Sequence, residues 1–165
     1  MANTQFERLL EPGYIGPVKT RNRMIKTGAG LMMWHEDETT MNAKVMAFYE
    51  SLARGGIGLL IVESPTIDWP AGARWRARYR IDDDKYVNGL SALPKMIHSY
   101  GCPTFMQMNH DGPWQTPLFE DPDPAFKGPP IAASRVFLKA DNDFHNVMPR
   151  ELTIPEIETI IDKFA

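Results

Sequence analysis

Short apolar runs alternate with helical patterns along the first two thirds of the chain, and this alternation constrains the fold most strongly. Residues 57–62 (IGLLIV) and 103–108 (PTFMQM) have the length and composition of strands buried on both faces of a parallel sheet. Each follows a segment, 41–54 or 87–97, in which apolar residues recur every three or four positions. Strands that alternate with amphipathic helices predict βαβ units and a parallel sheet.

Residues typical of helix ends separate these elements. Gly55-Gly56 ends the first predicted helix, and Gly101 follows the second. The acidic run 82–84 suits the start of the second helix because the helix dipole favours negative charge there. Pro94 lies inside this helix and removes a backbone hydrogen bond, so we expect a kink or two short helices.

Two further elements are predicted before the first helix. Residues 23–27 (RMIKT) are a strand candidate, and residues 14–23 predict a hairpin whose turn is Gly16-Pro17. After the last predicted strand, a loop rich in proline, glycine and aspartate extends over residues 111–150.

A last helix is predicted after this loop because Thr153 and Glu156 have the spacing of a capping box. The order is therefore hairpin, strand, helix, strand, helix, strand, loop and helix. A closed (β/α)8 barrel needs about 250 residues, and the chain has 165. We predict an α/β fold, the N-terminal portion of a (β/α)8 TIM barrel, in which residues 1–165 form a partial domain that stops before the fourth strand. Long segments follow the strands, where barrel enzymes keep their chemistry.

Charge and composition exclude several classes of partner. The net charge of -3 gives no reason to expect a nucleic acid or an anionic membrane. A single cysteine, Cys102, cannot form an internal disulfide, and no histidine or cysteine pair has metal-site spacing. No signal-peptide core is present, and no apolar stretch approaches the roughly 18 residues of a membrane helix. We expect a cytoplasmic protein without a metal site.

Small residues follow the first strand candidate, at Gly28-Ala29-Gly30. A dinucleotide-binding fingerprint would need a third glycine where this chain has Met33. Two interpretations stay open. The glycines simply turn the chain, or the small side chains let a flat cofactor lie against the backbone.

Polar residues lie at the ends of the other two strands. Ser64 follows the second strand, and Gln107 and His110 lie at the end of the third. A buried primary amide needs partners for two donors and one acceptor, so Gln107 bonds either to neighbouring backbone or to a ligand such as the pyrimidine edge of a flavin. A lone histidine such as His110 is more often structural than a ligand-binding residue.

Basic residues alternate with others in residues 73–80 (ARWRARYR), which places four arginines on one side of an extended chain. The aspartates at 82–84 could neutralise them in a solvated, ion-paired loop. Alternatively, Arg74 or Arg76 recognises a carboxylate or phosphate on a substrate, because guanidinium forks suit such groups.

Four segments taken together resemble the NADH:flavin oxidoreductase/old yellow enzyme family, over nearly the whole chain. They are FERLLEPGYIGPVKTRNRMI from residue 6, FYESLARGGIGLLIVES from residue 48, FMQMNHDGPW from residue 105 and PRELTIPEIETIIDKFA from residue 149. Each segment is weak evidence alone, but their order and spacing are specific.

The resemblance implies that the first strands contribute part of an FMN site. The cofactor-binding residues implied are Thr27, Gly28, Ala29, Gly30, Ser64 and Gln107. Trp34 falls in the loop that helps to shape the substrate pocket in relatives. Together with His110, Arg74 and Arg76, it makes up the candidate substrate-binding residues. The chain departs from the family at Gly30, where relatives often have threonine, cysteine or histidine, and after His110, where Ala-Gly-Arg is common.

The function implied is that of an FMN-dependent ene-reductase, which passes a hydride from NAD(P)H via the flavin to an activated C=C bond of an unsaturated carbonyl compound. The family's catalytic residues come from later strands, so we expect none in this chain and no activity from it alone. We expect a small-molecule substrate, and a homo-oligomer or a second chain that completes the barrel. The alternatives are a non-flavin TIM-barrel lyase and a non-catalytic binding half-barrel.

Overall fold

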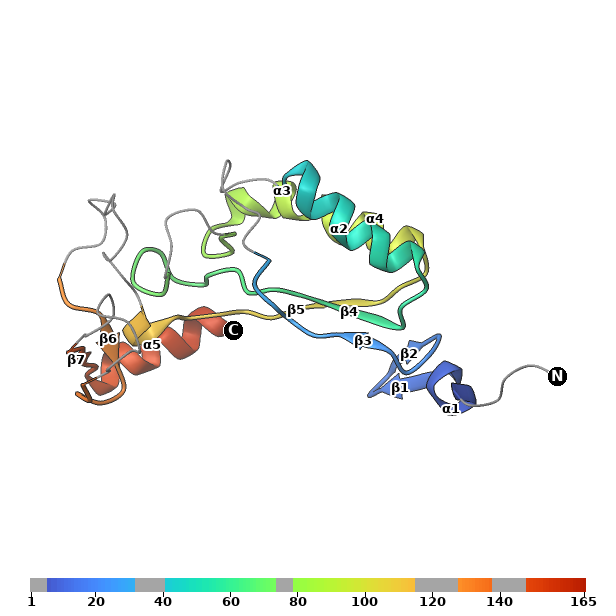
Figure 1. Ribbon diagram of the computed structural model, residues 1–165. Helices are drawn as coiled ribbons and strands as arrows, with labels where there is room; N and C mark the ends of the chain where they lie inside the picture. The colour runs from blue at the N-terminus through green and yellow to red at the C-terminus, as the bar shows by residue number, and fades with distance from the viewer. Residues whose placement is uncertain (1–5, 32–40, 74–78, 115–127, 138–147) are drawn as a thin grey trace. The chain divides into compact units, whose positions relative to one another are not determined.

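The computed structural model describes residues 6–31, 41–73, 79–114, 128–137 and 148–165 (Figure 1). These residues form two compact units. The first comprises Met1–Ser64 and Lys85–Gln107, and the second comprises Pro65–Asp84 and Met108–Ala165.

The first unit opens with a short helix and the predicted hairpin. Helix α1 (Glu7–Leu10), which the sequence patterns did not predict, precedes strands β1 (Gly13–Ile15) and β2 (Val18–Thr20). The two strands pair antiparallel with Ile15 opposite Val18, so Gly16-Pro17 forms the turn as predicted. Gly16 has a φ of 55°, a backbone conformation that glycine adopts without a steric penalty.

The three predicted strands form one parallel sheet. Strands β3 (Ile25–Lys26), β4 (Leu59–Val62) and β5 (Thr104–Met106) lie in the order β3-β4-β5. Each is shorter than predicted, but all three positions are confirmed. The central strand β4 is the most buried, as expected for a continuous apolar run with a neighbour on each side.

Helix α2 (Ala43–Arg54) joins β3 to β4 and carries the predicted apolar stripe. Val45, Tyr49 and Ala53 are buried, and the side chain of Asn42 caps the helix by accepting from the backbone N–H of Val45. Together with α3 (Val87–Leu90) and α4 (Ala92–Ser99), α2 covers one side of the β3-β4-β5 sheet (Figure 1). This helix layer and strand β4 enclose the core of the first unit.

The second predicted helix consists of two short helices, one of the two outcomes expected from Pro94. A 3-10 turn, η2 (Asp84–Tyr86), leads into α3 (Val87–Leu90) and α4 (Ala92–Ser99). The break falls at Ser91, because the ring of Pro94 is incompatible with a helical carbonyl four residues earlier, at Leu90.

Arg21 and Asn22 brace the loop ends at the start of the sheet. The guanidinium of Arg21 donates to the backbone carbonyls of Ala53 at 2.7 Å, Ile57 at 3.0 Å and Tyr100 at 3.1 Å. The amide of Asn22 donates to the carbonyl of Gly56 at 2.7 Å. One short segment thus satisfies carbonyl groups at the ends of both α2 and α4.

The second unit contains a strand pair that the sequence patterns did not predict. Strands β6 (Ile131–Ala132) and β7 (Arg150–Glu151) pair in parallel, so the prediction of a plain loop over 111–150 was wrong at these positions. A 3-10 turn, η3 (Gly112–Trp114), follows the third strand of the sheet.

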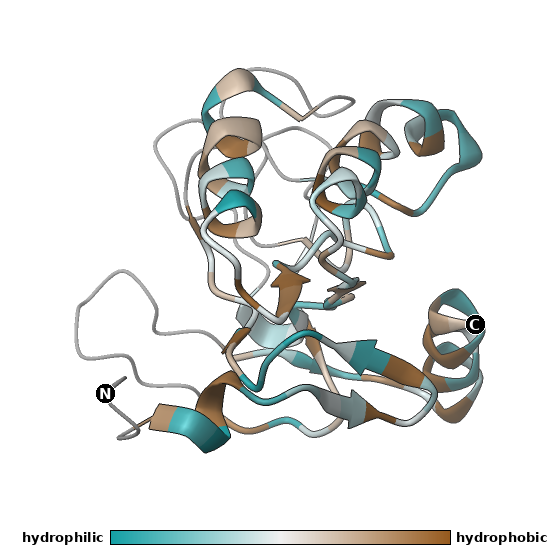
Figure 2. Ribbon diagram, turned by 90° about the vertical axis from the view of Figure 1, so that its right-hand side faces the viewer, coloured by the Kyte–Doolittle hydropathy of each residue, from teal (hydrophilic) through white to brown (hydrophobic). Residues whose placement is uncertain are grey.

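The last helix, α5 (Ile154–Phe164), begins where the capping box predicted. The backbone N–H of Thr153 donates to the carboxylate of Glu156 at 2.8 Å, and Arg150 holds the same carboxylate through two hydrogen bonds. Hydrophobic and hydrophilic residues alternate along the turns of α5 (Figure 2). None of the helices in the described ranges is both long and apolar enough to span a membrane.

Candidate cofactor site

The six predicted cofactor residues follow the three parallel strands of the first unit. Residues 27–30 come after β3, Ser64 after β4 and Gln107 after β5. Since parallel strands end at the same edge of a sheet, the fold places all six at its C-terminal edge. In barrels and other α/β folds this edge carries the ligand site.

Gly28 and Gln107 lie directly against each other at this edge. A Cβ built on Gly28 would lie 2.9 Å from the Cδ of Gln107 and 3.4 Å from its Cβ, and would overlap Oε1. Strand β4 separates β3 from β5 in the sheet. Contact between residues of alternate strands is the way in which side chains form layers inside a barrel.

The carboxamide of Gln107 is available to a ligand. The backbone N–H of Gln107 donates to the carbonyl of Val62 at 2.9 Å, so sheet pairing continues one residue beyond β5. The side chain is exposed, and it makes no hydrogen bond with any residue in the described ranges. Two donors and one acceptor are therefore present at the sheet edge.

These residues fit a flat cofactor with a polar edge. Thr27, Ala29 and Gly30 are exposed, and none carries a bulky side chain that would keep a ring system from the backbone. The amide of Gln107 offers the complementary donors and acceptor beside them. The donor set and the small residues both match the FMN expectation.

An ion pair between the half-buried Lys26 and the buried Glu63 lies immediately before two of these residues, and sequence reasoning missed it. The Nζ of Lys26 lies 3.8 Å from the carboxylate of Glu63 and 3.3 Å from the hydroxyl of Tyr49, which also bonds to Glu63. Burial lowers the pKa of Lys26, and the charge of Glu63 opposes that shift. The sequence did contain a signal for this pair, because Lys26 and Glu63 are charged residues of opposite sign at the ends of two apolar strand patterns.

The pair ties β3, β4 and α2 together just ahead of Thr27 and Ser64. The ammonium group of Lys26 also lies 5.0 Å from the centre of the Tyr49 ring, within the range of a cation–π contact. The C-terminal ends of β3 and β4 are therefore anchored to α2 at the point where the candidate site begins.

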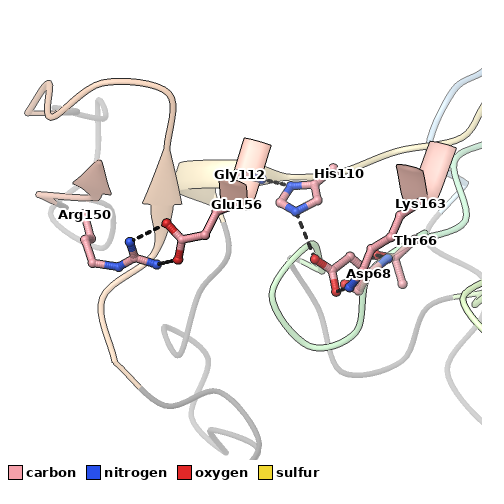
Figure 3. Close-up of polar contacts among 7 residues, drawn as sticks. All are labelled: Thr66, Asp68, His110, Gly112, Arg150, Glu156 and Lys163. Carbon is pink, nitrogen blue, oxygen red and sulfur yellow. Dashed lines mark hydrogen bonds and ion pairs between the residues drawn. The ribbon is translucent and has the colours of Figure 1, made fainter. Parts of the chain in front are cut away.

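His110 belongs to a polar array in the second unit (Figure 3). Its Nδ1 accepts from the backbone N–H of Gly112 at 3.1 Å, and its Nε2 lies 3.5 Å from a carboxylate oxygen of Asp68. Lys163 of α5 binds the other oxygen of Asp68. The imidazole of His110 has the largest effect in lowering the pKa of Asp68, and Lys163 lowers it further, against the opposing effect of burial.

Both ring nitrogens of His110 thus face protein groups, which agrees with the structural interpretation of a lone histidine. Gly72 packs close to the ring, since a Cβ at this position would lie 2.8 Å from the Cδ2 of His110. The array joins the segments after β4 and β5 to the last helix. A role of His110 in substrate binding stays a prediction.

Of the arginine-rich segment 73–80, the structure describes Ala73, Tyr79 and Arg80. Arg80 forms two hydrogen bonds with Asp82, at 2.9 and 2.8 Å, and its guanidinium lies 4.8 Å from the centre of the Trp69 ring. The ion-paired interpretation is confirmed for Arg80. Trp34, Arg74 and Arg76 lie outside the described residues.

Comparison with known proteins identifies the family. Residues 8–165 match the model of the NADH:flavin oxidoreductase / NADH oxidase family. An NADH oxidase from Thermoanaerobacter brockii is 36% identical over 162 residues, which are 98% of this chain and 23% of that protein.

Solved structures show the same fold. An old yellow enzyme homologue from Zymomonas mobilis superposes with a TM-score of 0.77 at 22% identity, over 94% of this chain and 42% of that one. The old yellow enzyme from Trypanosoma cruzi superposes with a TM-score of 0.76 at 24% identity, over 96% of this chain and 46% of that one. The chain thus spans less than half the length of these relatives, and the predicted fold class, the N-terminal portion of a (β/α)8 barrel, is confirmed. With the family model matched from residue 8 to residue 165, the chain belongs to the NADH:flavin oxidoreductase / NADH oxidase family.

Proposed function

We propose that this chain supplies part of the FMN site of a flavin-dependent ene-reductase that uses NAD(P)H as its reductant. The observation that carries the proposal is the carboxamide of Gln107, which makes no hydrogen bond with any described residue and lies against the backbone of Gly28 at the C-terminal edge of the sheet. Family membership supports the flavin, and the name of the Thermoanaerobacter brockii relative, an NADH oxidase, supports a nicotinamide reductant.

Each candidate residue has a role that follows from its chemistry. The amide of Gln107 would hydrogen-bond to the pyrimidine edge of the flavin, which presents both donors and acceptors. Residues 27–30 would let the ring lie against the backbone, since two of the four are glycines. Ser64 would meet the flavin from the end of β4.

The chemistry that FMN supplies when bound is transfer of a hydride from NAD(P)H to the β-carbon of an unsaturated carbonyl compound. The protein residues bind and orient, and the Lys26–Glu63 pair holds the ends of β3 and β4 in place behind the site. We assign no proton donor to this chain.

We also propose that the chain associates with a second chain or copy through its sheet. In the described part of the chain, β3 and β5 each pair with β4 alone, and such open edges favour association. Size-exclusion chromatography with light scattering tests this point, and a stable monomer would contradict it.

The test of function begins with the colour of the purified intact protein. We expect a visible flavin spectrum, FMN in the supernatant after denaturation, and anaerobic oxidation of NADH or NADPH that depends on an unsaturated ketone. Mass spectrometry of the product should show addition of two hydrogens across the C=C bond.

A variant assigns the binding to the proposed residue. Gln107→Leu should weaken FMN binding by about tenfold, the usual effect of losing one or two hydrogen bonds to a polar group. Met106→Leu, one position earlier on β5, is the matched control and should bind FMN normally. A protein that neither contains nor binds FMN would favour a lyase or a binding protein instead.

A further inference from the structure

We propose that Gly28 is a positioning residue, whose missing side chain leaves the volume in which the carboxamide of Gln107 is held toward the cofactor. This inference rests on the proposed FMN site. It assigns to Gly28 a role other than turning the chain, and a role beyond contact with the ring.

The geometry is specific to glycine. A methyl group at position 28 would overlap the Oε1 of Gln107 and lie 2.9 Å from its Cδ, closer than side-chain carbons approach. The φ of Gly28 lies outside the positive range, so an L-residue would meet no backbone strain there. The constraint at this position is therefore the space that Gln107 occupies.

No hydrogen bond within the described ranges holds the carboxamide in this place. The backbone of Gln107 is bonded to Val62, but its side chain is exposed and forms no hydrogen bond there. A glutamine side chain has several rotamers of similar energy. The absence of a Cβ at position 28 is thus required for the observed orientation.

This arrangement separates cofactor binding from stability. In Gly28→Ala the added methyl would push the end of a flexible, exposed side chain into another rotamer, which costs the fold little. The amide would then point away from its present position. We therefore expect a loss of FMN affinity without a matching loss of stability.

The experiment compares four proteins: wild type, Gly28→Ala, Gln107→Ala and the double variant. FMN dissociation constants come from flavin fluorescence, and urea midpoints report stability. We expect Gly28→Ala to weaken binding about tenfold, with a urea midpoint close to that of wild type. In the Gln107→Ala background the same substitution should change affinity less than about twofold, because the displaced group is gone.

An FMN-independent measurement accompanies the titrations. In the cofactor-free wild-type protein, the side-chain amide protons of Gln107 should show nuclear Overhauser contacts to the Hα protons of Gly28, and Gly28→Ala should remove them. Absence of these contacts in the wild type would overturn the inference.

The remaining outcomes distinguish the two proposals. FMN binding by the wild type with equal affinity in Gly28→Ala would overturn the positioning role and leave the proposed function intact. An equal loss in both backgrounds would also overturn it, because Gly28 would then act directly on the ring. Failure of the wild type to bind FMN would refute the proposed function itself.

Discussion

Loss of Arg21 should weaken the first unit strongly, because one guanidinium group serves three separate carbonyls. Its hydrogen bonds reach Ala53, Ile57 and Tyr100 at 2.7–3.1 Å. Ala53 and Tyr100 lie at the ends of α2 and α4, where helices leave carbonyl groups without intrahelical partners. The substitution Arg21→Gln keeps a polar side chain but removes the positive charge and the guanidinium group that donates to three carbonyls at once.

The expected magnitude follows from the exposure of each bond. The bond to Ala53 is partly buried and should contribute about 2 kcal/mol, as hydrogen bonds to charged groups do. The other two are exposed, so water replaces them and each contributes about 0.5 kcal/mol. Arg21→Gln should therefore lower the free energy of unfolding by about 3 kcal/mol.

Urea denaturation of the intact protein measures this loss, with an expected decrease in the midpoint of about 1–2 M at an unchanged slope. Arg23→Gln is the matched control two positions away. Arg23 pairs with Glu11 at 3.3 Å, but both side chains are more than half exposed, at 56% and 53%, so the control should lose less than about 0.5 kcal/mol. Equal effects of the two substitutions would refute the assignment of the brace to Arg21.

Three further predictions concern other charges. Glu63→Ala should lower the free energy of unfolding by about 2 kcal/mol, because it leaves the half-buried ammonium group of Lys26 without its carboxylate. Urea denaturation of this variant measures the loss, and the double variant Lys26→Met/Glu63→Ala should recover part of it. Arg150 and the Thr153 backbone lower the pKa of Glu156 from 4.5 to about 2. The stabilising contribution of Glu156 should be present above pH 4.5 and lost as the pH falls toward 2, and Glu156→Gln should flatten that part of an acid unfolding profile. If Arg76 recognises a substrate carboxylate, Arg76→Gln should raise KM for an enoate but not for its methyl ester. Equal effects on both substrates would instead support the interpretation of the segment as an ion-paired loop.

Local patterns predicted the elements where a local cause produces them. The apolar stripe of α2, the turn at Gly16-Pro17 and the capping box of α5 each depend on residues within one or two helical turns or a single hairpin. Pro94 likewise predicted a divided helix, because its ring excludes a carbonyl on the same segment. These features need no knowledge of distant contacts.

Pairing between distant segments was beyond the reach of those patterns. Strands β6 and β7 are two residues long and lie in a segment rich in loop-forming residues, and each exists only because the other pairs with it. The same holds for the hydrogen bond that Lys163 donates to Asp68, because the two residues are 95 positions apart and no sequence periodicity predicts their contact.

The candidate site divides in the same way. The sequence alone determined that small residues, a serine and a glutamine would follow three successive parallel strands, because strand order and side-chain type are written along the chain. The tertiary structure alone decided that Gly28 and Gln107 meet across an intervening strand, that Lys26 and Glu63 pair behind them, and that both nitrogens of His110 face protein groups. The physical reason is that these contacts join residues from different strands and loops, and their distances are set by the curvature and packing of the sheet, which hydrophobic spacing along one segment does not encode.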